Sequence, residues 1–220
     1  MSDTSRRILV WDLATRLFHW LTLTMVVAAY FTWRMDWMKW HAWTGDAVLA
    51  LIFFRIVWGF VGSDSARFSH FVARPRVVAS YLAHLLVRAP DRQVGHNPAG
   101  GWMVLLLLTL LLGQAISGIL VNNEVAVNGP LGDLVTTPVA NLVTDLHTIL
   151  WDALLGAIAL HVLAILVYAL VKGQNLLLPM LTGYKVLPKE VSAPRAASAT
   201  RALAVLAAGT GAAVALANFL

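Results

Sequence analysis

Residues 145–172 read DLHTILWDALLGAIALHVLAILVYALVK, a long apolar run that contains two histidines, His147 and His161. They lie 14 residues apart, close to four turns of α-helix, so both side chains point to within about 40° of the same face. Along the helix axis they are separated by ~21 Å, most of the thickness of a bilayer core. We expect one membrane-spanning helix with an imidazole near each surface, an arrangement that two stacked metal centres would need.

The composition indicates a polytopic, all-α membrane protein. Of the 220 residues, 59% are hydrophobic and only 12% are charged, with a mean hydropathy of +0.74, whereas a soluble domain carries roughly a quarter charged residues. Cysteine is absent, which excludes disulfides, iron–sulfur clusters, thiolate zinc sites and covalent c-type haem. Any metal must therefore be held by histidine, methionine or carboxylate.

Hydropathy predicts four spans in a domain of residues 1–190: 13 to about 33, 41 to about 62, 102 to about 121, and the run that ends at Lys172. Asp12 is a predicted helix N-cap, and 77–87 is a predicted amphipathic surface helix. The Ala-rich segment 191–220 is predicted to add a fifth transmembrane helix, whose GTGAA centre favours close packing. Tryptophans near the predicted span ends suggest an interfacial belt: Trp11, Trp20, Trp33, Trp37 and Trp40.

The net charge of +5 comes from basic residues in loops between the spans, a distribution typical of membrane topology rather than of a nucleic-acid binding patch. With the N-terminus in the cytoplasm, only Arg34 and Lys39 fall outside and Arg55 falls within a span, so the positive-inside rule is satisfied. The outer loop 122–144 has no Lys or Arg but contains Glu124 and Asp133. We expect a multi-pass membrane protein that contacts lipid and binds no nucleic acid.

Depth in the predicted membrane pairs four of the seven histidines. His19 would meet His161 at the inner level, and His41 would meet His147 at the outer level. Two imidazoles per level suit the two axial positions of a haem better than a four-coordinate zinc ion. The alternative is buried histidines that bond to backbone or water.

The remaining histidines, His70, His84 and His96, fall in loops and are interpreted as solvated.

Arg55 is a further candidate for cofactor binding, because it lies within the second span and a buried guanidinium needs an anion. The propionates of the inner haem would supply one, while snorkelling to the inner headgroups is an equal alternative. Asp46 and Asp152 would carry protons for a quinone or orient a ligand, although helix-to-helix hydrogen bonding is favoured.

Glycines in the spans would make room for a flat cofactor or for close helix packing: Gly45, Gly59, Gly113, Gly118 and Gly156.

Five motifs carry a family resemblance: VWDLATRLFHW, FRIVWGFVGS, ARFSHFV, GHNPAGG and NLLLPMLTGYK. Over about residues 8–186 the chain resembles the bacterial cytochrome b561 and Ni,Fe-hydrogenase cytochrome b family. The resemblance implies a four-helix cytochrome of the inner membrane that holds two b haems. It implies the same four iron ligands, His19 with His161 and His41 with His147. The tail after Lys189 lies outside the shared pattern.

Family members exchange electrons between the quinone pool, ubiquinone or menaquinone, and an outer-face partner. Some serve hydrogenases, some serve c-type cytochromes, and one branch oxidises superoxide. We therefore expect an electron-transfer subunit between quinone and a periplasmic c-type cytochrome or hydrogenase-like protein, with a homodimer left open. Alternatives are a stand-alone superoxide:ubiquinone or quinol oxidoreductase, for which only Arg34 and Lys39 could steer an anion, and a transporter with a histidine proton relay.

Overall fold

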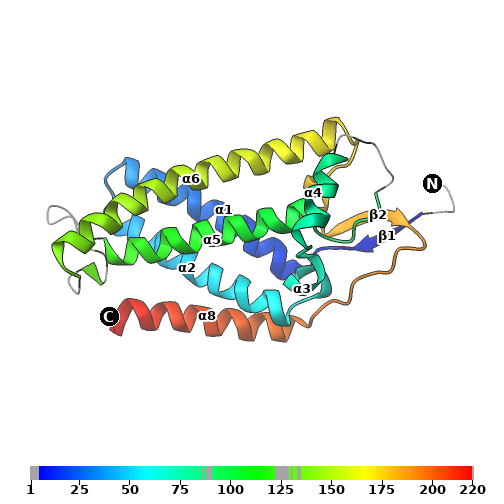
Figure 1. Cartoon of the computed structure of the whole chain (residues 1–220). Coiled ribbons are helices and arrows are strands. Elements are labelled where there is room, and N and C mark those ends of the chain that lie inside the picture. Colours follow the sequence, from blue (N-terminus) through cyan, green and yellow to red (C-terminus); the bar gives the residue numbers. More distant parts are fainter. Residues whose placement is uncertain are drawn as a thin grey trace.

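The computed structural model describes residues 5–85, 87, 91–121, 129, 131–132 and 135–219. Its long helices run side by side: α1 (Leu13–Arg34), α2 (Met38–Val61), α5 (Pro98–Leu120) and α6 (Thr137–Leu170) (Figure 1). Within the described residues these four helices are long and apolar enough to cross a membrane. The predicted all-α membrane bundle is therefore confirmed.

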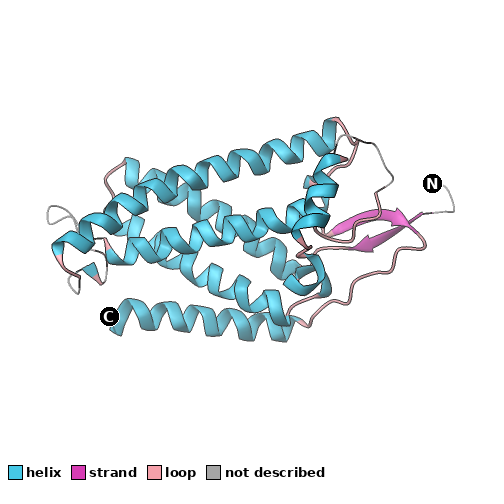
Figure 2. Ribbon diagram, in the orientation of Figure 1, coloured by secondary structure: helices cyan, strands magenta, loops and turns pink. Residues whose placement is uncertain are grey.

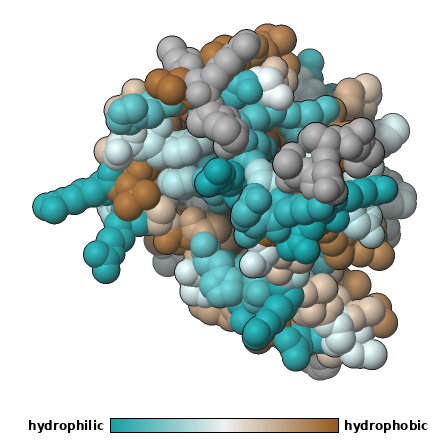
Figure 3. All heavy atoms as spheres, turned by 90° about the vertical axis from the view of Figure 1, so that its right-hand side faces the viewer, coloured by the Kyte–Doolittle hydropathy of each residue, from teal (hydrophilic) through white to brown (hydrophobic). Residues whose placement is uncertain are grey.

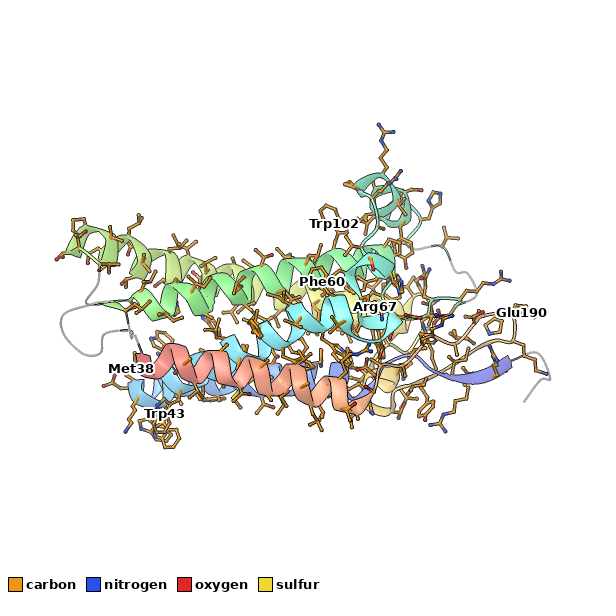
Figure 4. The ribbon with its side chains drawn as sticks, turned by 90° about the horizontal axis from the view of Figure 1, so that it is seen from below. Met38, Trp43, Phe60, Arg67, Trp102 and Glu190 are labelled. Atoms are coloured by element: carbon orange, nitrogen blue, oxygen red, sulfur yellow. The ribbon has the colours of Figure 1, made fainter. Side chains whose placement is uncertain are left out.

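Short elements gather at the end of the bundle where the N-terminus lies (Figures 1 and 2). They are β1 (Ser5–Leu9), the 3₁₀ turn η1 (Asp64–Ala66), α3 (Phe68–Phe71), α4 (Pro75–Ala83), α7 (Leu177–Thr182) and β2 (Tyr184–Pro188). We call this the sheet end, and the opposite end, where α1 connects to α2, the far end. Hydrophilic residues cover much of the sheet-end face in Figure 3. Figure 4 places Met38 and Trp43 at the far end, and Arg67 and Glu190 at the sheet end.

The two-stranded sheet was not predicted from the sequence. β1 and β2 pair antiparallel, from Ser5 opposite Pro188 to Leu9 opposite Tyr184. Gly183 precedes β2 with φ +87°, a left-handed conformation that favours glycine. Its carbonyl accepts hydrogen bonds from the backbone amides of Val10 and Trp11, at 2.8 and 3.1 Å. The sheet therefore fastens the start of α1 to the chain that follows α6.

Most helix starts follow local signals. Asp12 caps α1 as predicted, because its Oδ1 accepts from the Thr15 amide at 2.6 Å. The GHNPAGG motif supplies the start of α5, where the Asn97 side chain accepts from the Gly100 amide at 2.8 Å. Pro98 fills the first position, which needs no amide donor.

Several predicted boundaries were wrong, among them the start of α5, which lies at Pro98 rather than residue 102. α6 begins at Thr137 rather than residue 145, and α2 begins at Met38 rather than residue 41. Hydropathy detects the lipid-facing length of a helix, and both helices continue into more polar sequence. The surface helix α4 ends at Ala83 rather than residue 87, and none of its residues is buried. Glu124 and Asp133 of the predicted acidic loop lie outside the described residues.

The C-terminal helix α8 (Ala199–Phe219) lies along α2 (Figure 1). Gly209 makes the close packing predicted for GTGAA, because a Cβ there would lie 3.1 Å from the Phe53 ring and 3.2 Å from the Ala50 carbonyl. Arg201 donates to the Val61 carbonyl at 3.1 Å, which fixes the start of α8 beside the end of α2. That α8 crosses a membrane, and that it forms a unit separate from residues 1–190, stay predictions.

Candidate cofactor sites

Helix α6 carries one histidine near each end of the bundle, and each faces a histidine on another helix. His161 faces His19 of α1, and His147 faces His41 of α2. The ring centroids are 6.4 Å apart in both pairs, with interplanar angles of 52° and 83°. These are the two pairs expected from depth, and their role as metal ligands stays a prediction.

The separation of the rings suits one metal ion between them. A metal–imidazole bond is about 2 Å long and the ring nitrogen lies roughly 1 Å from the ring centre, so two axial imidazoles have centroids about 6 Å apart. The observed 6.4 Å matches this spacing in both pairs.

Hydrogen bonds fix the tautomer of both far-end histidines. The Nδ1 of His41 lies 2.9 Å from the Ala29 carbonyl, which only accepts, so Nδ1 carries the proton. The Ser117 hydroxyl donates to the Gln114 carbonyl at 3.0 Å, so at 2.9 Å it accepts from Nδ1 of His147. The Gln114 amide nitrogen, a donor, lies 3.0 Å from Nε2 of His147. Both Nε2 atoms are therefore unprotonated, as an iron ligand must be. The lone pair of His147 Nε2 accepts from Gln114 in this structure, so the Gln114 amide would have to turn away when a metal binds there.

The sheet-end histidines have a different environment. The Nδ1 of His19 is shielded from solvent and has no hydrogen-bond partner among the described residues. The ring of Trp20 lies edge-on at 4.9 Å. Within the same part of the chain nothing hydrogen-bonds the ring of His161. Polar atoms at this site are thus left for a ligand.

Arg55 is buried at the sheet end of the bundle, with a relative exposure of 2%. Its guanidinium lies over the rings of Phe68 and Phe71, at 5.0 and 5.9 Å from their centroids. Nη1 and Nη2 have no acceptor among the described residues. The alternative that Arg55 snorkels to headgroups is therefore wrong for this conformation, because the side chain is enclosed by protein. The Asp12 carboxylate acts on this guanidinium electrostatically without a hydrogen bond to it, and a haem carboxylate would be an anion able to bond to its Nη atoms.

His96 corrects the sequence interpretation, which treated it as a solvated loop residue. Its ring centroid lies 4.6 Å from those of Trp11 and Phe71, and its Nδ1 is buried without a partner in the described chain. Burial lowers the pKa of His96 to about 3, and the positive charge of Arg55 contributes. One signal in the sequence could have indicated this burial. His96 directly precedes Asn97, the N-cap of α5, so it belongs to a helix start rather than to a free loop.

Trp11, predicted for an interfacial belt, is 8% exposed and belongs to this buried cluster. His70 and His84 are exposed, as interpreted.

The two candidate carboxylates do not make the helix-to-helix hydrogen bonds that were favoured. Asp46 is partly buried and Asp152 is exposed, and neither has a hydrogen-bond partner in the described ranges. Of the candidate glycines, three are packed closely by other side chains: Gly59, Gly113 and Gly118. The other two, Gly45 and Gly156, face open space within 4 Å of the position a Cβ would take.

Residues 10–183 match the family described as prokaryotic cytochrome b561. The chain belongs to the prokaryotic cytochrome b561 family. A similar protein is the probable Ni/Fe-hydrogenase B-type cytochrome subunit of Rhizobium leguminosarum bv. viciae, 28% identical over 142 residues. That match covers 52% of this chain and 59% of the relative, so the chain spans less than two thirds of the relative's length. No solved structure matches the chain.

Membership in the cytochrome b561 family indicates membrane electron transfer through b-type haem. The residues of this chain fit such a group, because each site offers two imidazoles at a suitable spacing and the sheet end adds a guanidinium whose Nη atoms have no hydrogen-bond acceptor among the described residues. The motifs that carry the family resemblance meet at the sheet end. Asp12 of the first accepts from the Trp58 indole of the second at 3.3 Å. A Cβ on Gly101 of the fourth would lie 2.6 Å from the Phe71 carbonyl of the third.

Proposed function

We propose that this cytochrome b561 family member holds two b haems and passes electrons across the bacterial inner membrane between the quinone pool and a redox partner on the outer face. The observation that carries the proposal is the pair of matched histidine sites at two levels of one helix, α6, each with ring centroids 6.4 Å apart. Haem b in each site would supply a one-electron Fe³⁺/Fe²⁺ couple.

Each haem would be held by residues from two helices. His19 and His161 would be the axial ligands at the sheet end, where Arg55 would pair with a propionate. His41 and His147 would be the ligands at the far end. The two ligands on α6 are ~21 Å apart along the helix axis, so the sites lie at different depths and neither histidine serves both.

The orientation proposed is with the N-terminus and the sheet end in the cytoplasm. The hydrophilic face in Figure 3 and the Lys and Arg residues of the short elements support it. The far end would then face the outer partner. The name of the Rhizobium relative supports a hydrogenase-like partner, and a c-type cytochrome is the other class. The quinone would be ubiquinone or menaquinone. Helix α8, which lies along α2, would be a fifth crossing.

A stand-alone superoxide:ubiquinone or quinol oxidoreductase is the second candidate. One observation favours it: two cations, Arg34 and Lys39, precede His41 by seven and two residues at the far end and lie over the Trp33 and Trp43 rings, 5.7 and 5.0 Å from the centroids. Cations beside a site steer small anions toward it. The purified protein would then be reduced by superoxide without a partner protein, and Arg34→Gln with Lys39→Gln would slow that reduction.

The ligand assignment is tested by removing one histidine of each pair. His161→Ala should lose the sheet-end haem and His147→Ala the far-end haem, so each variant keeps one haem per polypeptide. Haem content and reduced-minus-oxidised spectra of the detergent-purified protein measure this. His70→Ala, on the exposed surface, is the control and should keep both. Retention of both haems in either ligand variant would refute the assignment.

The quinone link has a separate test. A short-chain ubiquinol or menaquinol, mixed with the purified oxidised protein, should reduce the bound haem. Protein with two haems that neither quinol reduces, and whose reduced haem neither quinone oxidises, would exclude the quinone pool as the electron source or sink.

A further inference from the structure

The two histidine pairs differ in what holds the second nitrogen of each ring. At the far end the Nδ1 atoms of His41 and His147 both donate hydrogen bonds, to the Ala29 carbonyl and the Ser117 hydroxyl, each at 2.9 Å. At the sheet end the Nδ1 of His19 has no partner among the described residues. The sequence does not reveal this asymmetry, because nothing in it distinguishes Ser117 from other small residues of the spans.

Ser117 is built to accept rather than to donate. It is 4% exposed, and its own proton is directed to the Gln114 carbonyl at 3.0 Å, one turn earlier on α5. The hydroxyl oxygen therefore faces His147 with its lone pairs. The next residue, Gly118, allows the close approach, since a Cβ there would lie 3.1 Å from Cε1 of His147.

An acceptor on Nδ1–H changes the ligand as well as its orientation. It draws the proton away from the ring, which makes Nε2 a stronger electron donor to a bound metal. A stronger donor stabilises Fe³⁺ relative to Fe²⁺ and so lowers the reduction potential. At the sheet end the effect is absent for His19, and the positive charge of Arg55 disfavours the extra charge of Fe³⁺, which raises the potential.

From this asymmetry we infer that Ser117 is a positioning residue that makes the far-end haem the lower-potential centre of the two. Its hydroxyl fixes the Nδ1–H tautomer of His147 and increases the basicity of the ligand. The inference rests on the proposed two-haem function and names a residue outside the ligand set that sets the order of the two potentials.

The experiment is a redox titration of the detergent-purified holoprotein with two haems. Ser117→Ala removes the acceptor, so the lower of the two midpoint potentials should shift upward while the higher one stays in place as an internal reference. Ser117→Thr keeps a hydroxyl and should leave both potentials near the wild-type values. Thr148→Val is the matched control, because Thr148 is next to His147 in sequence but, within the part of the chain that the structure describes, its hydroxyl donates only to the Thr144 carbonyl of its own helix.

Several outcomes would overturn the inference. They are a lower potential that does not move in Ser117→Ala, a shift downward, a shift of the higher potential instead, or an equal shift in Thr148→Val. If Ser117→Ala fails to retain the far-end haem, Ser117→Cys replaces it, since a thiol is a weaker acceptor and should give a smaller upward shift. A wild-type protein with fewer than two haems would refute the proposed function, whereas two haems with an unmoved potential would refute only the role of Ser117.

Discussion

The sheet end and the far end of the bundle present the same pair of imidazoles in two different settings. At the sheet end the pair is surrounded by short elements, a buried cation and the closely packed motifs that carry the family resemblance. At the far end the rings donate hydrogen bonds to a backbone carbonyl and one serine hydroxyl, and the tryptophans Trp33, Trp37, Trp40 and Trp43 are exposed.

This difference shows which end of the bundle depends on particular side chains. The sheet end depends on side chains of defined shape and charge, so substitutions there should be severe. The far end depends on a few polar contacts, and its exposed aromatic surface suits lipid headgroups and a partner. Substitutions at the two ends should therefore differ in the property that they change as well as in the size of the effect.

The largest effect is expected from Gly101→Val, which would drive a side chain into the Phe71 carbonyl, 2.6 Å from the Cβ position. Backbone cannot move aside as a flexible side chain does, so α3 would separate from α5 and haem-loaded protein would be lost. Yield of haem-containing protein in membranes measures this. Gly211→Ala is the control, because nothing lies within 4 Å of its Cβ position, and helix propensity predicts a gain of up to ~1 kcal/mol. Normal yield of Gly101→Val would show that the sheet end is loosely packed.

A smaller and selective effect is expected from Arg55→Gln. Loss of the buried positive charge should lower the occupancy and the midpoint potential of the sheet-end haem and leave the far-end haem unchanged, because an anion paired with Arg55 would lose its partner. Haem content and a redox titration measure both quantities. Arg55→Lys keeps the charge and should retain more of each. An unchanged sheet-end haem in Arg55→Gln would remove Arg55 from the site.

Acidification should destabilise the protein through His96. Its pKa is about 3 in the folded chain and about 6.5 in an unfolded chain, so between these values the unfolded chain binds more protons. Stability is therefore lost as the pH falls below about 6.5, by up to ~1.4 kcal/mol per pH unit. His96→Gln should show a shallower decrease of the thermal midpoint between pH 7 and 4.5, and the exposed His70→Gln should keep the wild-type slope. Equal slopes for His96→Gln and wild type would mean that His96 does not titrate in this way.

The smallest effect is expected from Asp12→Ala at the start of α1. The substitution removes the cap on Thr15 and the acceptor for the Trp58 indole, which together contribute about 1–2 kcal/mol. Thermal unfolding in detergent should show a lower midpoint with both haems still bound. Asp12→Asn keeps a capping oxygen and should fall between the two. A midpoint for Asp12→Ala equal to that of wild type would show that neither contact matters.

The sequence predicted those parts of the fold that local patterns determine. Hydropathy located the spans, and Asp12 marked the start of α1 because a cap acts within three residues. The pairing of β1 with β2 was missed, since it joins residues about 180 positions apart and no local pattern encodes it. The start of α6 at Thr137 was missed because residues 137–144 are less apolar than the run that follows them.

The candidate sites were likewise predicted where a local rule was enough. Counting helical turns gave the pairs His19 with His161 and His41 with His147, because rise per residue alone sets depth. The burial of His96 required tertiary contacts with Trp11 and Phe71. The bond from His147 to Ser117 joins two helices whose rotation the sequence does not state.

The most direct measurement is the ratio of haem to polypeptide in the purified wild-type protein, made with ample haem supply and quantified by pyridine haemochrome spectra. Two b haems per chain, with two midpoint potentials, are expected if each histidine pair holds one. A colourless protein, or one haem per chain, would contradict the central claim that both pairs bind haem.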